Sequence, residues 1–335
     1  MKGTNKILVI RFSSIGDIVL TTSFLETIKS KFLNSEIHFL TLDKFAPILA
    51  MQPNISRVIS LSSSADFLDL IHFKKHIGLA RYDVIYDLHS SLRSKFLTIG
   101  LDIKVVTINK PRLLRFILFQ FHKNKFPKDF STIMMYHNCL GWGHSNNFPD
   151  TKLVVSKAEQ VYARNFLYKN KVGSNFIVLV PGAAWAQKQW YSNRYSEVIN
   201  KIVEKTGKDI IMLGGENDKI CKEINQINSH VINFAGKTDL REAMAIISLS
   251  DVVFGSDTGL MHIAESLGKS VSMILGPTSV ETGGGTYLKN SVNIESDIWC
   301  RPCSQNGSKK CFRSNQYCMD FIKTDTVANS VLKRV

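Results

Sequence analysis

The sequence contains no run of 18 or more apolar residues, the length that a helix needs to cross a bilayer. Its first apolar segment, residues 7–10, is followed at once by Arg11. That segment is too short for the hydrophobic part of a secretory signal peptide. Low-complexity tracts are missing as well, and a hydrophobic fraction of 44% is ordinary for a folded domain. We therefore expect a folded protein that stays in the cytoplasm.

Three motifs that would indicate other functions are also absent. The dinucleotide fingerprint Gly-x-Gly-x-x-Gly follows no predicted strand, and the glycines at 283–285 are not placed after one, which disfavours a nicotinamide oxidoreductase. No Walker phosphate-binding loop is present. No nucleic-acid motif with interleaved aromatic residues occurs either. A basic nucleic-acid-binding module nevertheless stays open as an alternative of a different class, because the formal net charge is +14.

This excess of positive charge favours anionic partners, such as nucleic acid, phosphorylated glycans or an acidic membrane surface. Residues 110–125 mix basic side chains with large apolar ones. The apolar part is too short to cross a bilayer but can lie in its interface beside anionic lipid. The alternative is a core-packed helix with basic ends.

A length of 335 residues predicts two domains. Short apolar runs alternate with helical patterns in both halves, which is typical of parallel sheets covered by helices. Residues 141–149, rich in Gly, Asn and Pro, indicate a linker. We expect a GT-B architecture: two Rossmann-like domains, 1–150 and 151–335, facing across a cleft. The predicted strands are 6–12, 36–41, 57–61, 83–87 and 104–108 in the first half, and 176–180, 209–213, 231–234, 252–255 and 270–275 in the second.

Ligands of open α/β sheets bind beyond the carboxyl ends of the strands, so the loops there are candidate sites. After the first strand, Gly16 permits a tight turn and Asp17 begins a helix. Asp17 can act as a general base towards a hydroxyl, or Ser14 and Asp17 can simply cap the helix. After residue 180, a Pro-Gly turn and Lys188 suit phosphate binding, with a surface lysine as the alternative.

Two further loops in the second half carry polar residues. Glu216, after a Gly-Gly turn, can hold ribose hydroxyls or favour a helix N-terminus by its charge. The backbone N–H groups at Thr258 and Gly259 open a helix and suit a diphosphate. His262 lies one turn later, as a pocket residue or a structural histidine.

Taken together, these loops resemble glycosyltransferase family 9, the lipopolysaccharide heptosyltransferases, over nearly the whole chain. The resemblance is carried by five segments in matching order and spacing. They are Ser13-Ser14-Ile15-Gly16-Asp17-Ile18-Val19, Pro181-Gly182-Ala183, Lys188-Gln189-Trp190, Gly214-Gly215-Glu216 and Ser256-Asp257-Thr258-Gly259-Leu260-Met261-His262.

The resemblance implies an inverting transfer of heptose from ADP-heptose to the lipopolysaccharide inner core, either Kdo-lipid A or a heptosylated core. Asp17 would be the catalytic base, and Lys188 would neutralise the diphosphate leaving group without any required metal. The donor-binding residues would be Ser13, Ser14, Gly16, Pro181, Gly182, Lys188, Glu216, Asp257, Thr258, Gly259 and His262. The first domain would hold the anionic glycolipid at the cytoplasmic face of the inner membrane, and no nucleic acid would be a partner. Another nucleotide sugar or a protein acceptor stays open.

Four of the six cysteines cluster near the carboxyl end as Cys300-x2-Cys303-x7-Cys311-x6-Cys318. In a reducing cytoplasm this pattern favours a metal over disulfides. One tetrahedral Zn²⁺ with a structural role is the expected ion, and free thiols are the main alternative.

Overall fold

The computed structural model describes residues 6–141 and 147–335 of the chain. Its internal contacts divide the chain into two compact units. The first comprises Met1–Lys110 with Thr132–Val154, and the second comprises Pro111–Ser131 with Val155–Val335. The division is therefore not a single cut along the sequence, and the expected boundary at residue 150 stays a prediction. Of the expected linker at 141–149, residues 142–146 lie outside the described residues.

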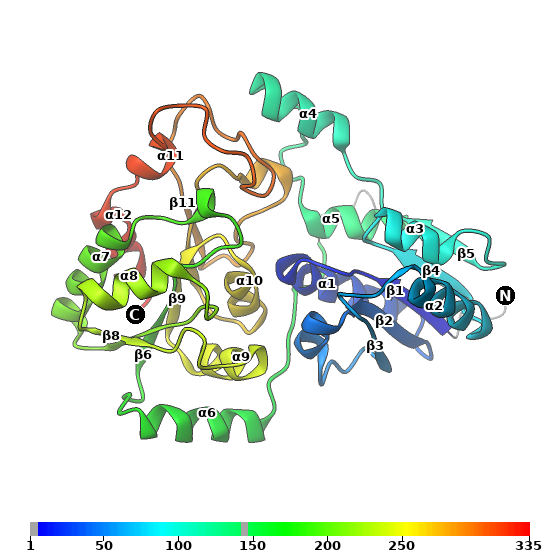
Figure 1. Cartoon of the computed structure of the whole chain (residues 1–335), viewed down its shortest axis with the longest axis horizontal. Helices are drawn as coiled ribbons and strands as arrows, with labels where there is room; N and C mark the ends of the chain where they lie inside the picture. The colour runs from blue at the N-terminus through cyan, green and yellow to red at the C-terminus, as the bar shows by residue number, and fades with distance from the viewer. Residues whose placement is uncertain (1–5, 142–146) are drawn as a thin grey trace. The chain divides into compact units, whose positions relative to one another are not determined.

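The first unit is built on a five-stranded sheet in the order β3-β2-β1-β4-β5, with every pairing parallel (Figure 1). Ile7, Leu8, Val9 and Ile10 of the central strand are fully buried, which is why that strand is apolar after its first residue, Lys6. Its strands are β1 (Lys6–Ile10), β2 (Glu36–Leu42), β3 (Arg57–Leu61), β4 (Val84–Asp87) and β5 (Lys104–Thr107). The helical segments are α1 (Ile15–Lys31), η1 (Asp43–Leu49), α2 (Phe67–Leu79), α3 (Leu92–Thr98), α5 (Thr132–His137) and η2 (Asn138–Leu140).

The second unit repeats the plan with six parallel strands in the order β11-β10-β9-β6-β7-β8. Its strands are β6 (Phe176–Val180), β7 (Asp209–Met212), β8 (Val231–Asn233), β9 (Val252–Ser256), β10 (Val271–Ile274) and β11 (Val292–Ile294). The helical segments are α4 (Arg112–Phe121), α6 (Lys157–Lys169), η3 (Ala186–Lys188), α7 (Ser192–Thr206), α8 (Lys219–Ile227), α9 (Leu240–Leu249), α10 (Gly259–Ser266), η4 (Val280–Thr282), α11 (Tyr317–Asp320) and α12 (Thr324–Leu332).

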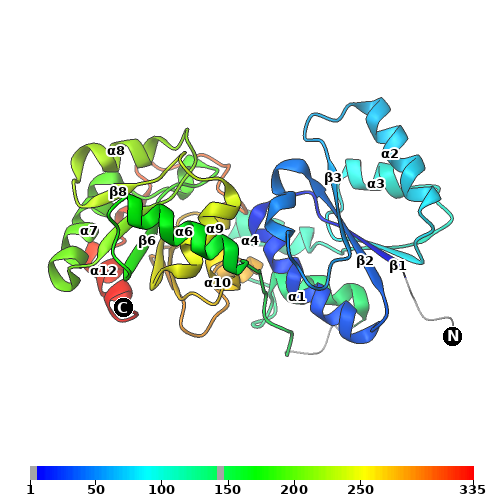
Figure 2. The same ribbon diagram turned by 90° about the horizontal axis from the view of Figure 1, so that it is seen from below.

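Helices cover both faces of each sheet. In the first unit, α2 and α3 pack through Ile77 and Leu97 against Leu8 and Ile10, and α1 covers the other face (Figure 2). In the second unit, α7, α8 and α12 share one core, while α9 contacts both α6 and α10. Two doubly wound parallel sheets confirm the expected fold class.

The strand order places a switch point in each sheet. The chain runs outward from β1 through β2 to β3 and then returns to β4 on the other side of β1. It does the same from β6 through β8 and back to β9. Crevices beyond the carboxyl ends of such strand pairs are where doubly wound sheets bind ligands. The loops after β1 and β4, and those after β6 and β9, are therefore the places where a site is expected.

Candidate active site

In the first unit, Asp17 lies in the first turn of α1, directly beyond β1. Its Oδ2 accepts hydrogen bonds from the backbone N–H and hydroxyl of Ser14, at 3.1 and 2.8 Å. The same oxygen lies 2.6 Å from a guanidinium nitrogen of Arg11, and the Tyr136 hydroxyl donates to Oδ1 at 3.3 Å. Asp17 therefore caps the N-terminus of α1 by its bonds to Ser14, and it also forms an ion pair with Arg11.

Arg11 is the charge that controls this carboxylate. Its guanidinium is buried and donates to the carbonyl of Leu88, beyond β4, at 2.7 Å. Burial alone would raise the pKa of Asp17, but attraction to Arg11 and the hydrogen bonds from Ser14 outweigh it and hold the pKa at about 2. Asp17 is thus ionised throughout the neutral range.

The loop after β4 carries further polar residues, which are held by hydrogen bonds to Asp87. Asp87 is fully buried at the end of β4 and accepts from the backbone N–H groups of His89 and Ser90, at 2.9 and 2.8 Å. The His89 ring packs edge-on against Phe12, with ring centroids 5.1 Å apart. Burial, with the nearby charges of Arg11 and Lys110, lowers the pKa of His89 to about 4, so its imidazole is neutral at pH 7.

In the second unit, Lys188 and Asp257 form the central ion pair. Lys188 ends η3 in the loop after β6, and its Nζ lies 2.8 Å from Oδ2 of Asp257, which follows β9. The Thr278 hydroxyl donates to the same oxygen at 2.9 Å, and His262 Nε2 lies 4.0 Å from Oδ1. Burial alone would raise the pKa of Asp257, but Lys188 and His262 outweigh it and lower the pKa. The structure thus brings together three of the predicted residues: a largely covered cation, its carboxylate and a histidine.

The start of α10 lies beside this pair. Thr258 is the N-cap residue and Gly259 is the first helical residue. The first backbone N–H groups of a helix have no partner within it, and they carry the positive end of the helix dipole. Together with the Lys188 ammonium, this arrangement can bind a diphosphate and stabilise charge that develops on it.

The remaining predicted residues line the loops after β6 and β7. Ser256, the last residue of β9, holds the loop after β6, because its hydroxyl donates to the carbonyl of Pro181 at 2.9 Å. Gly182 has no room for a side chain, since a Cβ would lie 2.5 Å from Oδ2 of Asp218. Glu216 is exposed on the loop after β7, as a residue that contacts a ligand would be.

The sequence matches the model of glycosyltransferase family 9 (heptosyltransferase) over residues 70–311. The chain belongs to glycosyltransferase family 9. It is therefore an enzyme, and the resemblance expected from the loop motifs is confirmed. The family assignment supports the glycosyltransferase prediction, and it does not favour the alternative of a nucleic-acid-binding module.

Relatives and solved structures agree with this assignment. The family 9 chain is 26% identical to lipooligosaccharide heptosyltransferase 2 of Haemophilus ducreyi over 297 residues, covering 82% of this chain and 84% of that one. It is 23% identical to lipopolysaccharide heptosyltransferase 2 of Escherichia coli over 305 residues, covering 82% and 83%. A family 9 glycosyltransferase from Veillonella parvula shares the fold with a TM-score of 0.80 at 18% identity, covering 99% and 98%. The ADP-heptose lps heptosyltransferase II of E. coli does so with a TM-score of 0.71 at 19% identity, covering 98% of each chain.

In this glycosyltransferase, several residues near Asp17 or Asp257 were assigned no role from the sequence. Arg11, His89 and Tyr136 surround Asp17, and Thr278 binds Asp257. Arg11 carried a usable signal, since a charge at the end of a buried strand needs a partner. The others carried none, because they come from distant segments that only the folded sheets bring near.

The zinc prediction for Cys300, Cys303, Cys311 and Cys318 is not supported. Within residues 6–141 and 147–335, no three or more His, Cys, Asp or Glu side chains are grouped to hold a metal, and all four thiols are free. The Arg313 guanidinium lies 3.7 Å from the Cys300 sulfur. Burial raises the pKa of Cys303, and it raises that of Cys318 to about 11.

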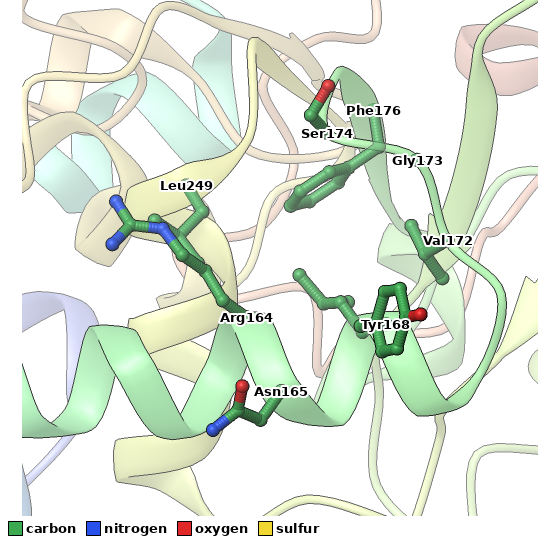
Figure 3. Close-up of a pocket in the computed structure, with 9 residues that line it drawn as sticks. Arg164, Asn165, Tyr168, Val172, Gly173, Ser174, Phe176 and Leu249 are labelled. Carbon is green, nitrogen blue, oxygen red and sulfur yellow. The ribbon is translucent and has the colours of Figure 1, made fainter.

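A separate pocket of about 470 Å³ lies away from the switch point (Figure 3). It is lined by the last turns of α6, including Arg164 and Tyr168, and by the segment leading into β6, including Val172 and Phe176. This is the amino end of β6, opposite the loops of Lys188 and Asp257. We therefore do not assign the donor to this pocket.

Proposed function

We propose that this glycosyltransferase moves a heptose from ADP-heptose to the lipopolysaccharide inner core, with inversion at the anomeric carbon. The observation that carries the proposal is the Lys188–Asp257 pair beside the start of α10, at the switch point of a family 9 chain. The acceptor would be Kdo-lipid A or a heptosylated core. The names of the relatives, lipopolysaccharide and lipooligosaccharide heptosyltransferases, support this donor and acceptor.

In this scheme the second unit binds the donor nucleotide and the first holds the acceptor. Lys188 and the backbone N–H groups at Thr258 and Gly259 bind the diphosphate. Glu216 binds the ribose, Asp257 contacts the sugar or orders its loop, and Pro181, Gly182 and His262 shape the pocket. Ser13, Ser14 and Gly16 contact the donor sugar near Asp17.

The reaction is a single displacement. The acceptor oxygen forms a bond to the anomeric carbon, the bond from that carbon to the diphosphate oxygen breaks, and ADP leaves with the electron pair. Asp17 takes the hydroxyl proton. With a pKa of about 2, Asp17 is a weak base towards a neutral hydroxyl. It therefore accepts the proton late, after bond formation has made that hydroxyl strongly acidic. Charge on the leaving diphosphate is met by Lys188, so the scheme needs no metal.

The donor assignment is tested by calorimetry with ADP, UDP, GDP and CMP. Lys188→Ala should weaken ADP binding at least tenfold, because a charge-assisted contact to the diphosphate is lost. Lys208→Ala is the matched control, since Lys208 pairs with Asp251 at 2.7 Å at the opposite end of the same sheet. Preference for UDP or GDP would move the donor to another nucleotide sugar. Equal binding by wild type and Lys188→Ala would remove Lys188 from the site.

The base assignment is tested by Asp17→Asn. It should abolish most turnover while leaving ADP affinity unchanged. Because Asp17 also caps α1, the control is Asp69→Asn, which removes the equivalent carboxylate from the capping box of α2. Full turnover by folded Asp17→Asn, or an equal loss in Asp69→Asn, would contradict the assignment.

We also propose that the enzyme works at the cytoplasmic face of the inner membrane, bound peripherally through α4. No helix among the described residues is long and apolar enough to span a bilayer. On α4, however, only Leu118 is buried, while Leu113, Phe116 and Phe121 are 69%, 55% and 60% exposed. No acidic residue occurs between Asp102 and Asp129, and exposed Arg112, Lys123, Lys125 and Lys128 accompany the apolar face. An exposed apolar face with basic flanks matches an anionic lipid surface.

Sedimentation with liposomes tests this surface. Anionic vesicles of phosphatidylglycerol and phosphatidylcholine should bind the protein at low salt and release it at high salt, while neutral vesicles should not bind. Leu113→Ser with Phe116→Ser should weaken binding about tenfold or more. Leu68→Ser with Leu79→Ser is the control, because these residues are equally exposed on α2. Equal loss in both double variants, or no binding at low salt, would refute the role of α4.

A further inference from the structure

The cysteine-bearing segment packs directly on the side chain of Lys188. Gly307 is buried and has a φ of +81°. A Cβ added there would lie 2.4 Å from Cγ and 2.8 Å from Cδ of Lys188, and 3.5 Å from Cβ of Trp185. Glycine at 307 thus lets the backbone lie against the aliphatic stem of the lysine, in a conformation that other residues rarely adopt.

The segment is bound on the Asp257 side of the ion pair. The backbone N–H groups of Cys303 and Ser304 both donate to the carbonyl of Pro277, at 3.2 Å. The Arg301 guanidinium donates to the carbonyl of Thr278 at 3.0 Å, and the Thr278 hydroxyl in turn binds Asp257. These bonds connect the segment to the partner of Lys188.

It is also bound on the Lys188 side. The Gln316 side chain donates to the carbonyl of Gln187, the residue before Lys188. Between the two attachments, the Ser304 hydroxyl accepts from the backbone N–H of Gly307 at 3.0 Å. Residues 301–316 are therefore attached next to both members of the ion pair, and Gly307 contacts the lysine stem between these attachments.

We propose that residues 301–316 are a positioning strap for Lys188, and that Gly307 sets where the ammonium group meets the donor diphosphate. A lysine side chain has four rotatable bonds, and a cation stabilises developing charge best when it is already in place. The strap restricts the stem, so the ammonium needs no rearrangement when the donor binds. Gly307 is a positioning residue that acts through Lys188, and the inference rests on the proposed role of Lys188 in diphosphate binding.

Gly307→Ala tests the strap. The added methyl must displace Lys188, so ADP affinity should fall about tenfold, as for loss of a charge-assisted contact. Gly268→Ala is the matched control, because Gly268 has a φ of +78° but no atom within 4 Å of an added Cβ. It carries the same backbone strain without touching Lys188 and should bind ADP as wild type does.

A double-mutant cycle separates positioning from general damage. In a Lys188→Ala background the methyl at 307 meets no Cγ or Cδ, so Gly307→Ala should then have no further effect on ADP affinity. Gln316→Ala gives a milder second variant that keeps the fold, with ADP binding about threefold weaker.

The outcomes are distinct. Wild-type ADP affinity in both Gly307→Ala and Gln316→Ala, or an equal loss from Gly307→Ala with and without Lys188, would overturn the strap while leaving the proposed function intact. If Lys188→Ala itself leaves ADP binding unchanged, the proposed role of Lys188 and the strap fall together. Weaker binding in Gly307→Ala, wild-type binding in Gly268→Ala and no further loss in the Lys188→Ala background would establish the strap.

Discussion

At the scale of single residues, the structure gives Asp17 a capping role that is compatible with its proposed role as the catalytic base. Its Oδ2 caps α1 through Ser14, and the same oxygen pairs with buried Arg11. Capping fixes the direction of the carboxylate, and the ion pair fixes its charge. A structural role and a catalytic role are therefore compatible, because both need an ionised, immobile carboxylate.

Removing Arg11 should change the pH dependence of catalysis. In Arg11→Gln, burial of Asp17 is no longer opposed by the guanidinium, so the pKa of Asp17 should rise from about 2. The acid limb of the kcat/KM profile should then move up into the accessible acid range, whereas the wild-type rate stays independent of Asp17 ionisation there. Arg11→Lys, which keeps the charge, should restore much of the wild-type profile. An unmoved acid limb in folded Arg11→Gln would show that Asp17 is not the base.

Glu265 is a second buried carboxyl, outside the proposed chemistry. It is 1% exposed, and its Oε1 accepts from the backbone N–H groups of Tyr287 and Leu288, both at 3.0 Å. Burial raises the pKa of Glu265 to about 7 despite these bonds. Because the folded pKa exceeds the unfolded value of about 4.3, the neutral acid favours the folded state at low pH. This contribution is lost as the pH rises towards 7.

The free energy of unfolding should therefore fall by on the order of 2–3 kcal/mol between pH 5 and pH 8 because of this one group. Glu265→Gln keeps the acceptor for the two N–H groups and cannot ionise, so it should remove this fall. Urea titrations at both pH values measure the difference, with exposed Glu223→Gln as the control. An unchanged pH dependence in Glu265→Gln would mean that Glu265 ionises normally in the folded protein.

At the scale of elements, the closeness of β6 and β9 shapes the proposed donor site. At Gly255 in β9, φ is +152° and a Cβ would lie 2.0 Å from the carbonyl oxygen of Val180 in β6. A side chain here would force apart the two strands whose following loops carry Lys188 and Asp257. The Lys188–Asp257 ion pair therefore depends on the absence of a side chain at Gly255.

Gly255→Ala should destabilise the second unit by more than about 3 kcal/mol, or prevent its folding, since the methyl can only be accommodated by moving backbone. Gly207→Ala, with a φ of +63° and open space around an added Cβ, should cost about 1 kcal/mol. Chemical denaturation of both variants makes the comparison. Similar stability of the two would show that β6 and β9 separate at little cost.

At the scale of the whole molecule, each unit has its own sheet and core. Unfolding should therefore depart from a single two-state transition. All residues proposed to bind the nucleotide lie in the second unit, so ADP should stabilise that unit selectively. At 100 times its Kd, ADP should contribute about 2.7 kcal/mol.

Hydrogen exchange followed by strand measures this selectivity. ADP should slow exchange in β6 and β9 and leave β1 and β4 nearly unchanged. Equal slowing in all four strands would indicate one cooperative unit and would contradict independent unfolding.

Much of the fold was predictable because buried parallel strands leave a strong local signal. The expected strand at 176–180 coincides with β6, and that at 252–255 differs from β9 by one residue. Local patterns were weaker elsewhere. The short edge strand β11 is not among the strands expected from the sequence.

The amino-acid sequence by itself determined the fold class, the family and the loops that carry Asp17, Lys188, Glu216 and Asp257. It could do so because apolar runs and turn residues act over a few neighbouring positions. Only the tertiary structure decided which groups meet: Arg11 with Asp17, Thr278 with Asp257, and Gly307 with Lys188. It also placed Arg313 beside Cys300, where spacing alone favoured a metal. Burial and charge pairing join residues far apart in the chain, so pKa values and positioning contacts follow from packing and not from local sequence.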